Sequence, residues 1–212
     1  MFTLLPGPVV RSEIVEKRSR FITTLSRAEN EHEAREIVSL VRAEFPDARH
    51  HCSAFVISSE AGPPRTHSSD DGEPSGTAGP PILEVLTGAN LVNVVTVVTR
   101  YFGGVLLGTG GLVRAYSSAT RTALNQASLA KRIRMDLVEV EVPSEFAGQF
   151  QSIIHQRGIR VLSEEWGASL RVTLALQGNQ VEEIEHLAAS LTRAPCTLIP
   201  IGTKVIDIPL SA

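Results

Sequence analysis

The sequence contains only two cysteines, Cys52 and Cys196, and neither belongs to a Cys-x-x-Cys motif. Disulfide frameworks and structural zinc sites need several suitably spaced cysteines, so this scarcity argues against both. It is typical of a reducing compartment, and we expect a cytoplasmic location. Residues 1–7 lack a basic segment followed by an apolar core, so we expect no signal peptide. No apolar run approaches the roughly 20 residues of a membrane-spanning helix, and we expect no membrane partner.

The chain also lacks a strong excess of charge of either sign. Its net charge is −3 over 212 residues. Residues 1–132 hold 14 basic and 13 acidic residues, a net charge of +1, whereas residues 133–212 hold 6 and 10, a net charge of −4. This balance excludes binding to nucleic acid through the charge of a whole domain, but it leaves a local basic patch open.

What the sequence does contain is an unusual stretch at residues 68–116. It begins with a cluster of turn-forming residues that includes three carboxylates, Asp70, Asp71 and Glu73. These carboxylates repel one another and require a cation, a basic side chain, backbone N–H donors or solvent. We favour turn formation and helix capping for them over a metal or acid–base role, because nothing marks a nucleophile beside them. We predict no metal, no cofactor and no catalytic residue.

The same stretch ends in a glycine-dense loop between an apolar run and a helical pattern. Its glycines are Gly103, Gly104, Gly108, Gly110 and Gly111. Glycine lets a ligand approach the backbone, and the N-terminus of the following helix favours an anion. The loop lacks the Lys-Ser/Thr of a Walker A motif and the third glycine of a dinucleotide fingerprint. Two interpretations stay open: an anion cradle, or a loop whose glycines allow tight packing of strand and helix.

Several basic residues are expected to flank this loop. Arg114 and Arg121 share one face of the helix because they are seven residues apart. They belong to a predicted phosphate-binding patch for RNA, together with Lys17, Arg18, Arg20 and Arg100. The alternative is ordinary solvated charge, or pairing with the acidic cluster.

The hydrophobic pattern of the first half predicts an α+β domain. We expect strands at 9–16, 19–26 and 51–58, and a buried central strand at 91–101. A helix should begin after Asn30, because Glu33 completes a capping box, and end at Pro46. Pro80 and Pro81 should start a short helix at 82–86, and a longer helix should run from the glycine loop to about Leu129.

The second half predicts a β-α-β-β-α-β order. Strands are expected at 134–142, 159–166, 169–176 and 197–205. Ser144 should cap the first helix, which stops at Gly158, and Asn179 with Glu182 should form a capping box for the second. This order is typical of a ferredoxin-like domain. The domain boundary should lie near residue 132, without a flexible linker.

The central stretch also resembles a known family. The resemblance rests on Gly-Glu-Pro-Ser-Gly-Thr-Ala-Gly at 72–79, Thr-Arg-Tyr-Phe-Gly-Gly at 99–104 and Leu-Gly-Thr-Gly-Gly-Leu-Val-Arg-Ala-Tyr at 107–116. Lys-Arg-Ser-Arg-Phe-Ile at 17–22 extends it. These motifs are similar to those of the IMPACT/YigZ family. The resemblance implies a first domain at 1–132 like domain 2 of ribosomal protein S5, and a ferredoxin-like second domain at 133–212, similar to the last domain of elongation factor G.

The resemblance further implies a link to translation, because eukaryotic relatives regulate it by competing for a ribosome-associated activator of a stress kinase. We therefore predict a non-enzymatic cytosolic binding protein with RNA or a ribosome-associated protein as its partner. Its surface should comprise residues 70–76, 100–104 and 108–114. The alternative is a phosphate-handling enzyme that uses the glycine loop as an anion cradle and an acidic residue as base or metal ligand.

Overall fold

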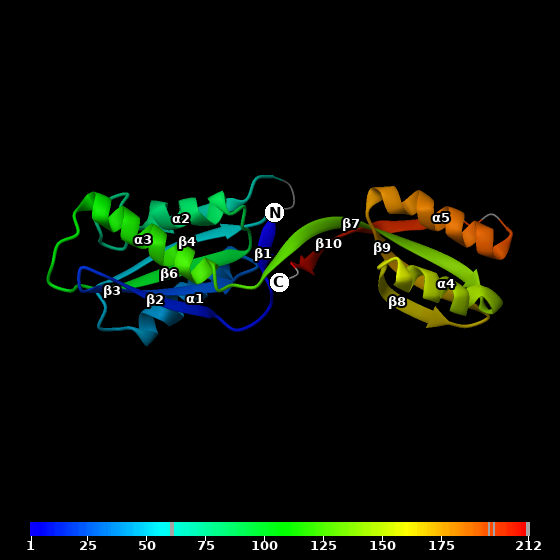
Figure 1. Cartoon of the computed structure of the whole chain (residues 1–212), viewed down its shortest axis with the longest axis horizontal. Helices are drawn as coiled ribbons and strands as arrows, with labels where there is room; N and C mark the ends of the chain where they lie inside the picture. The colour runs from blue at the N-terminus through cyan, green and yellow to red at the C-terminus, as the bar shows by residue number, and fades with distance from the viewer. Residues whose placement is uncertain (60–61, 195, 197, 211–212) are drawn as a thin grey trace. The chain divides into compact units, whose positions relative to one another are not determined.

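The computed structural model describes residues 1–59, 62–194, 196 and 198–210 (Figure 1). They divide into two compact units: Met1–Arg132 with the segment that begins at Asp207, and Ile133–Ile206. The sequence predicts a single boundary after residue 132. The segment from Asp207 falls in the first unit because Leu210 N donates to Leu129 O (3.0 Å) and the Asp207 carboxylate pairs with Arg27 (2.7 Å).

The first unit contains a five-stranded antiparallel sheet. Its strands lie in the order β2 (Val10–Glu16), β3 (Ser19–Arg27), β6 (Val94–Tyr101), β4 (His50–Ile57) and β5 (Arg65–Ser69). The predicted central strand is confirmed, although it starts at Val94. Strand β5 was not expected, because its sequence Arg-Thr-His-Ser-Ser is polar and largely exposed at the sheet edge and so carries no apolar alternation.

Helices cover both faces of this sheet. Helices α2 (Gly79–Gly88) and α3 (Thr109–Leu124) lie on one face, and α1 (Glu31–Glu44) lies on the other (Figure 1). Val94 and Val98 of β6 pack with the α2 and α3 core, while Val95 packs in the cluster that includes α1. Because both faces of β6 are buried, its sequence is a continuous apolar run rather than an alternation of apolar and polar residues.

The ends of these helices test the expected caps. The Asn30 side chain accepts from Glu33 N (2.9 Å), as the capping box predicts. Helix α3 ends at Leu124 rather than near Leu129, because Leu129 already begins β7 (Leu129–Pro143). Strand β1 (Phe2–Leu4) pairs with the first three residues of β7.

The second unit follows the predicted order of elements, with β7 as its first strand. It continues with α4 (Ser144–Gln156), β8 (Arg160–Trp166), β9 (Ser169–Leu176), α5 (Gly178–Thr192) and β10 (Ile199–Pro209). β9 pairs with both β7 and β8, and β10 pairs with β7, so the strands lie in the order β10-β7-β9-β8. The core of this unit joins the apolar sides of both helices to the sheet, through Phe150, Ile154, Ile184, Val140 and Leu174.

Two expected caps in this unit were wrong. Pro143 is the N-cap of α4, and Ser144 lies inside the helix with its hydroxyl donating to Ala168 O (2.8 Å). Helix α5 begins two residues earlier than expected, with a capping box formed by Gln177 and Gln180. Of the strand expected at 197–205, residue Thr197 lies outside the described residues. Within the described part of the chain, no helix has the length and apolar character needed to cross a bilayer.

Candidate functional site

Asp70 opens the acidic turn (residues 70–76) and holds it against α2. Its carboxylate accepts hydrogen bonds from the backbone N–H groups of Gly76 (2.8 Å), Ala78 (2.9 Å) and Gly79 (2.9 Å). Ala78 and Gly79 form the start of α2, so Asp70 supplies acceptors that the helix N-terminus lacks. Burial acts to raise the pKa of Asp70, but these three hydrogen bonds outweigh it and lower the pKa below its ordinary value. These contacts show Asp70 in the predicted capping role, at the N-terminus of α2.

Asp71 is engaged by the end of α1 and by β4. One carboxylate oxygen pairs with Arg42, and the other accepts from His51 N (2.6 Å). His50 Nδ1 lies 2.8 Å from the Asp71 carbonyl oxygen, within hydrogen-bond distance. Asp71 adopts a positive φ of 45°, which a short polar side chain tolerates better than most. Both aspartates thus shape the turn rather than face an open site.

Glu73 carries the third carboxylate into the interior. It is 8% exposed, and its Oε1 accepts from Arg100 Nη1 (2.7 Å) and from the Tyr116 hydroxyl (2.7 Å). The Cys52 thiol lies 3.3 Å from the same hydroxyl. Burial raises the pKa of Cys52 to about 12, and it also raises the pKa of Tyr116. Cys52 is therefore held as a neutral thiol and is unsuited to act as a nucleophile.

Arg100 is not part of a basic surface. It is 6% exposed because it follows Val98 by two residues on β6 and points to the same side of the sheet as that core residue. Its guanidinium pairs with Glu73 and lies over the Phe21 ring, 5.5 Å from the centroid. The alternative interpretation, pairing with the acidic cluster, is the correct one for Arg100.

Gly103 anchors the glycine loop (residues 103–111) to the turn between β2 and β3. Its N–H donates to the buried hydroxyl of Ser19 (3.1 Å). A Cβ atom at Gly103 would lie 2.0 Å from the carbonyl carbon of Arg18, so only glycine fits this approach. Gly103 therefore serves close packing, although against the β2–β3 turn rather than between strand and helix as the second interpretation expected. Gly104 and Gly108 adopt positive φ values of 82° and 72°. Glycine is favoured there because it has no Cβ atom to clash in this conformation.

The turn that Gly103 contacts consists of Lys17 and Arg18. These two residues link the paired residues Glu16 and Ser19, and both have positive φ, 46° and 66°. A two-residue hairpin with positive φ at both positions is usually built from Asn-Gly, because larger side chains are strained there. The chain therefore places two cations at a position where their backbone conformation costs free energy. Such strain is found most often at functional sites.

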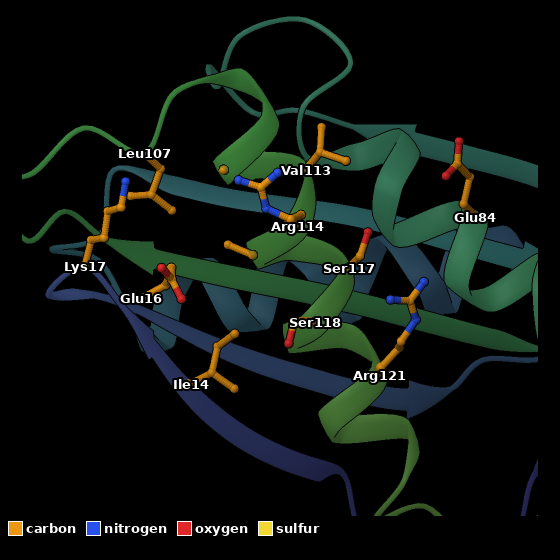
Figure 2. A pocket seen from close by; sticks show the side chains of 12 residues that line it. Ile14, Glu16, Lys17, Glu84, Leu107, Val113, Arg114, Ser117, Ser118 and Arg121 are labelled. Carbon is orange, nitrogen blue, oxygen red and sulfur yellow. The ribbon is translucent and has the colours of Figure 1, made fainter.

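A groove on the first unit brings this turn together with α3. Its volume is about 650 Å³. Lys17 and Glu16 lie at one end near Leu107 of the glycine loop, and Arg121 lies towards Glu84 of α2 at the other (Figure 2). Three cations, Lys17, Arg114 and Arg121, thus line the basic groove. The other lining residues are Ile14, Gly111, Val113, Ala115, Ser117 and Ser118.

The cations of the groove differ from Arg100 in being free of carboxylate partners. None of the ion pairs within the described chain involves Lys17, Arg114 or Arg121. The N-terminus of α3 adds to this positive character. Its N-cap, Gly108, supplies no side-chain acceptor for the first N–H groups of the helix, and Gly111 of the first turn lines the groove.

Of the predicted site residues, the structure brings Lys17, Gly111 and Arg114 into the basic groove. Gly104, Gly108 and Gly110 are exposed on the same loop. Arg18 is exposed at the turn, whereas Arg20 pairs with Glu13 (2.8 Å). The lining hydroxyls of Ser117 and Ser118 were not predicted, although their spacing of three and four residues from Arg114 would have placed them on its face. The part of the chain that the structure describes contains no cluster of three potential metal ligands.

Fold and groove define an α+β protein with a cation-lined surface site, and comparison with known proteins supplies its family. The model of the Impact N-terminal domain matches residues 17–124. The IMPACT family member YigZ of Escherichia coli is 35% identical over 199 residues, which cover 93% of this chain and 97% of the relative. The chain belongs to the IMPACT family.

Two further similarities extend this result. The IMPACT family member YvyE of Bacillus subtilis is 40% identical over 144 residues, which cover 68% of this chain and 65% of the relative. A solved structure described as a hypothetical protein is 34% identical, with a TM-score of 0.59 over 94% of this chain and 97% of that one. The similarity therefore spans both units.

Proposed function

We propose that this protein is a non-enzymatic binding protein that acts on the translation machinery and holds the phosphate backbone of RNA in the basic groove. The observation that carries the proposal is that one groove holds three cations, from two separate elements, which form no ion pair with any described residue. Lys17 comes from a strained turn, and Arg114 and Arg121 come from one helix face. Cations arranged in this way neutralise phosphates without reading sequence.

The spacing of the groove cations supports a polyanion over a single phosphate. Arg114 and Arg121 are two helical turns apart, which is about 10.5 Å along the axis of α3. At that backbone spacing each arginine can take a separate phosphate, and a nucleic acid backbone offers a series of phosphates. Ser117 and Ser118 lie between them as additional hydrogen-bond donors.

The link to translation rests on membership of the IMPACT family. The sequence resemblance implies that eukaryotic members of this family regulate translation. We further infer that the first domain, 1–132, is like domain 2 of ribosomal protein S5 and that the second, 133–212, is ferredoxin-like. The strand order β10-β7-β9-β8 supports the second assignment, since it is the fourth, first, third and second strand of the β-α-β-β-α-β unit. A cytoplasmic location follows from the same proposal.

A phosphate-handling enzyme requires an acidic residue at the anion site. Asp70, Asp71 and Glu73 do not line the groove, and each is engaged by backbone N–H groups or by an arginine. The carboxylates that do line it are Glu16 and Glu84. The acidic turn therefore supports the fold, and Glu16 and Glu84 are the carboxylates through which the enzyme alternative would have to act.

Fluorescence anisotropy with a labelled single-stranded RNA tests the proposal. A variant with Lys17→Ala and Arg114→Ala removes two groove cations and should bind at least about tenfold more weakly at moderate salt. The matched control is Arg160→Ala with Lys204→Ala, which removes the same two residue types from exposed positions outside the groove. The control should bind like the unmodified protein. Equal loss in both double variants, or no RNA binding at all, would overturn the proposal.

A further inference from the structure

An exposed apolar segment leads along the chain into the basic groove. It consists of Phe102, Val105 and Leu106, which are 49%, 40% and 82% exposed. Leu106 is the most exposed large apolar side chain in the described chain. Leu107, the next residue, already lines the groove. The apolar segment and the cation-lined surface are therefore continuous along the chain.

Packing at Gly103 also fixes the segment next to the basic turn. The Gly103 N–H donates to Ser19, and its Cα leaves no room for a side chain against Arg18. Phe102 is therefore held one residue from the point where the loop touches the turn that carries Lys17. The contact between Gly103 and the Lys17–Arg18 turn therefore links the Phe102 position to the turn that carries Lys17.

The Phe102 ring is backed from inside the domain. The buried Arg100 guanidinium carbon lies 5.6 Å from the centroid of that ring. Because Glu73 holds Arg100 in place (2.7 Å), the ring rests on a rigid support while about half of its surface remains exposed. An exposed aromatic ring together with a cation-lined groove is the combination with which proteins bind single-stranded nucleic acid.

We propose that the ligand is single-stranded RNA, with an unpaired base stacked on Phe102 and the adjoining phosphates in the basic groove; this inference rests on the function proposed above. Bases of a duplex are stacked on one another and are not available to an aromatic side chain, whereas unpaired bases are. Val105 and Leu106 extend the apolar surface next to the ring. The site discriminates single strands from duplexes and tolerates different bases, because every base has a stacking face.

The test compares a labelled 12-nucleotide single-stranded RNA with the same RNA annealed to its complement. Anisotropy titrations use the full chain with Phe102→Leu, which keeps an apolar side chain over Arg100 but removes the stacking face. Binding of the single strand should weaken by roughly 5- to 150-fold, the range for one stacked base. The matched control, Trp166→Leu, changes a 60% exposed aromatic residue of the second unit and should have no effect.

Four outcomes separate this inference from the function on which it depends. Weaker binding of single strands by Phe102→Leu, with duplex binding unchanged, supports stacking. Loss of binding in the Lys17→Ala, Arg114→Ala variant with normal binding by Phe102→Leu overturns stacking and leaves the basic groove in place. Duplex RNA bound as tightly as the single strand also overturns the inference. Absence of RNA binding by the unmodified protein overturns both.

A second readout guards against a folding defect in the Phe102 variants. Phe102→Trp in a Trp166→Phe background places the chain's single tryptophan at the proposed stacking position. Addition of the single-stranded RNA should quench its fluorescence while affinity stays near that of the unmodified protein. Unchanged fluorescence at saturating RNA would contradict contact between a base and residue 102.

Discussion

The acidic turn and the basic groove present opposite cases of the same feature, a cluster of three like charges. In the acidic turn every carboxylate has a partner within the fold: backbone N–H groups for Asp70, Arg42 for Asp71 and Arg100 for Glu73. In the groove, Lys17, Arg114 and Arg121 take part in none of the ion pairs between described residues. The carboxylates of the acidic turn stabilise the fold, whereas the cations of the basic groove are available to bind a ligand.

The difference teaches that local charge density does not identify a binding site. What distinguishes the clusters is whether distant parts of the chain supply counter-charges. Arg42 of α1 lies 29 residues before Asp71, and Arg100 of β6 lies 27 residues after Glu73. The Glu73–Arg100 pair is buried on both sides and is costly to break, whereas an exposed cation contributes little to the fold.

The largest effect should come from Glu73→Ala. It leaves the buried Arg100 guanidinium without its carboxylate, and removal of one partner from a buried pair costs about 3–5 kcal/mol. Urea denaturation followed by circular dichroism measures the free energy of unfolding. The control, Glu13→Ala, breaks the exposed pair with Arg20 and should cost less than about 1 kcal/mol. Similar losses in both variants would show that burial of the Glu73–Arg100 pair does not raise the cost of breaking it.

Gly103→Ala should have the next largest effect. The added Cβ would lie 2.0 Å from the Arg18 backbone, so loop and turn must separate, at a cost of about 1–3 kcal/mol. Gly110→Ala is the matched control, because its Cβ would meet only the Arg114 side chain, at 3.6 Å, and it lies within α3. Alanine there should be neutral or stabilising by up to about 1 kcal/mol. Equal destabilisation would mean that Gly103 has no special packing role.

Lys17→Asn combined with Arg18→Gly should act in the opposite direction on stability. Asn-Gly is the preferred pair for a hairpin with two positive φ values, so strain of about 1–2 kcal/mol should be relieved. RNA binding should weaken at the same time, because a groove cation is lost. A variant that is more stable and binds normally would show that the strained turn does not serve the ligand.

Much of the fold could be predicted from the sequence because its signals are local. The capping box at Asn30, the apolar run of β6 and the hairpin at Gly167 each act within a few residues, and all three appear in the structure. Strand β5 was missed because a polar edge strand is recruited by its neighbour rather than by its own pattern. The early start of α5 at Gly178 depended on which of two nearby polar pairs capped the helix.

The candidate site was predicted less completely, for a physical reason. Lys17 and Arg114 were predicted to share one basic patch, but its extent could not be predicted, because it depends on how the β2–β3 turn meets α3. Arg100 could have been assigned to the interior from its place in the alternation that includes Val98. The partner of Glu73 could not have been identified, because no periodicity relates the turn to β6.

The most direct test of the account is the dependence of RNA affinity on salt concentration. For single strands, each neutralised phosphate contributes a slope of about −0.7 to log affinity against log salt. Lys17→Ala should therefore reduce the steepness by about 0.7, with a change in folding stability below about 0.5 kcal/mol. Lys204→Ala, an exposed lysine outside the groove, should leave the slope unchanged. An unchanged slope in Lys17→Ala would contradict the assignment of the basic groove as the ligand site.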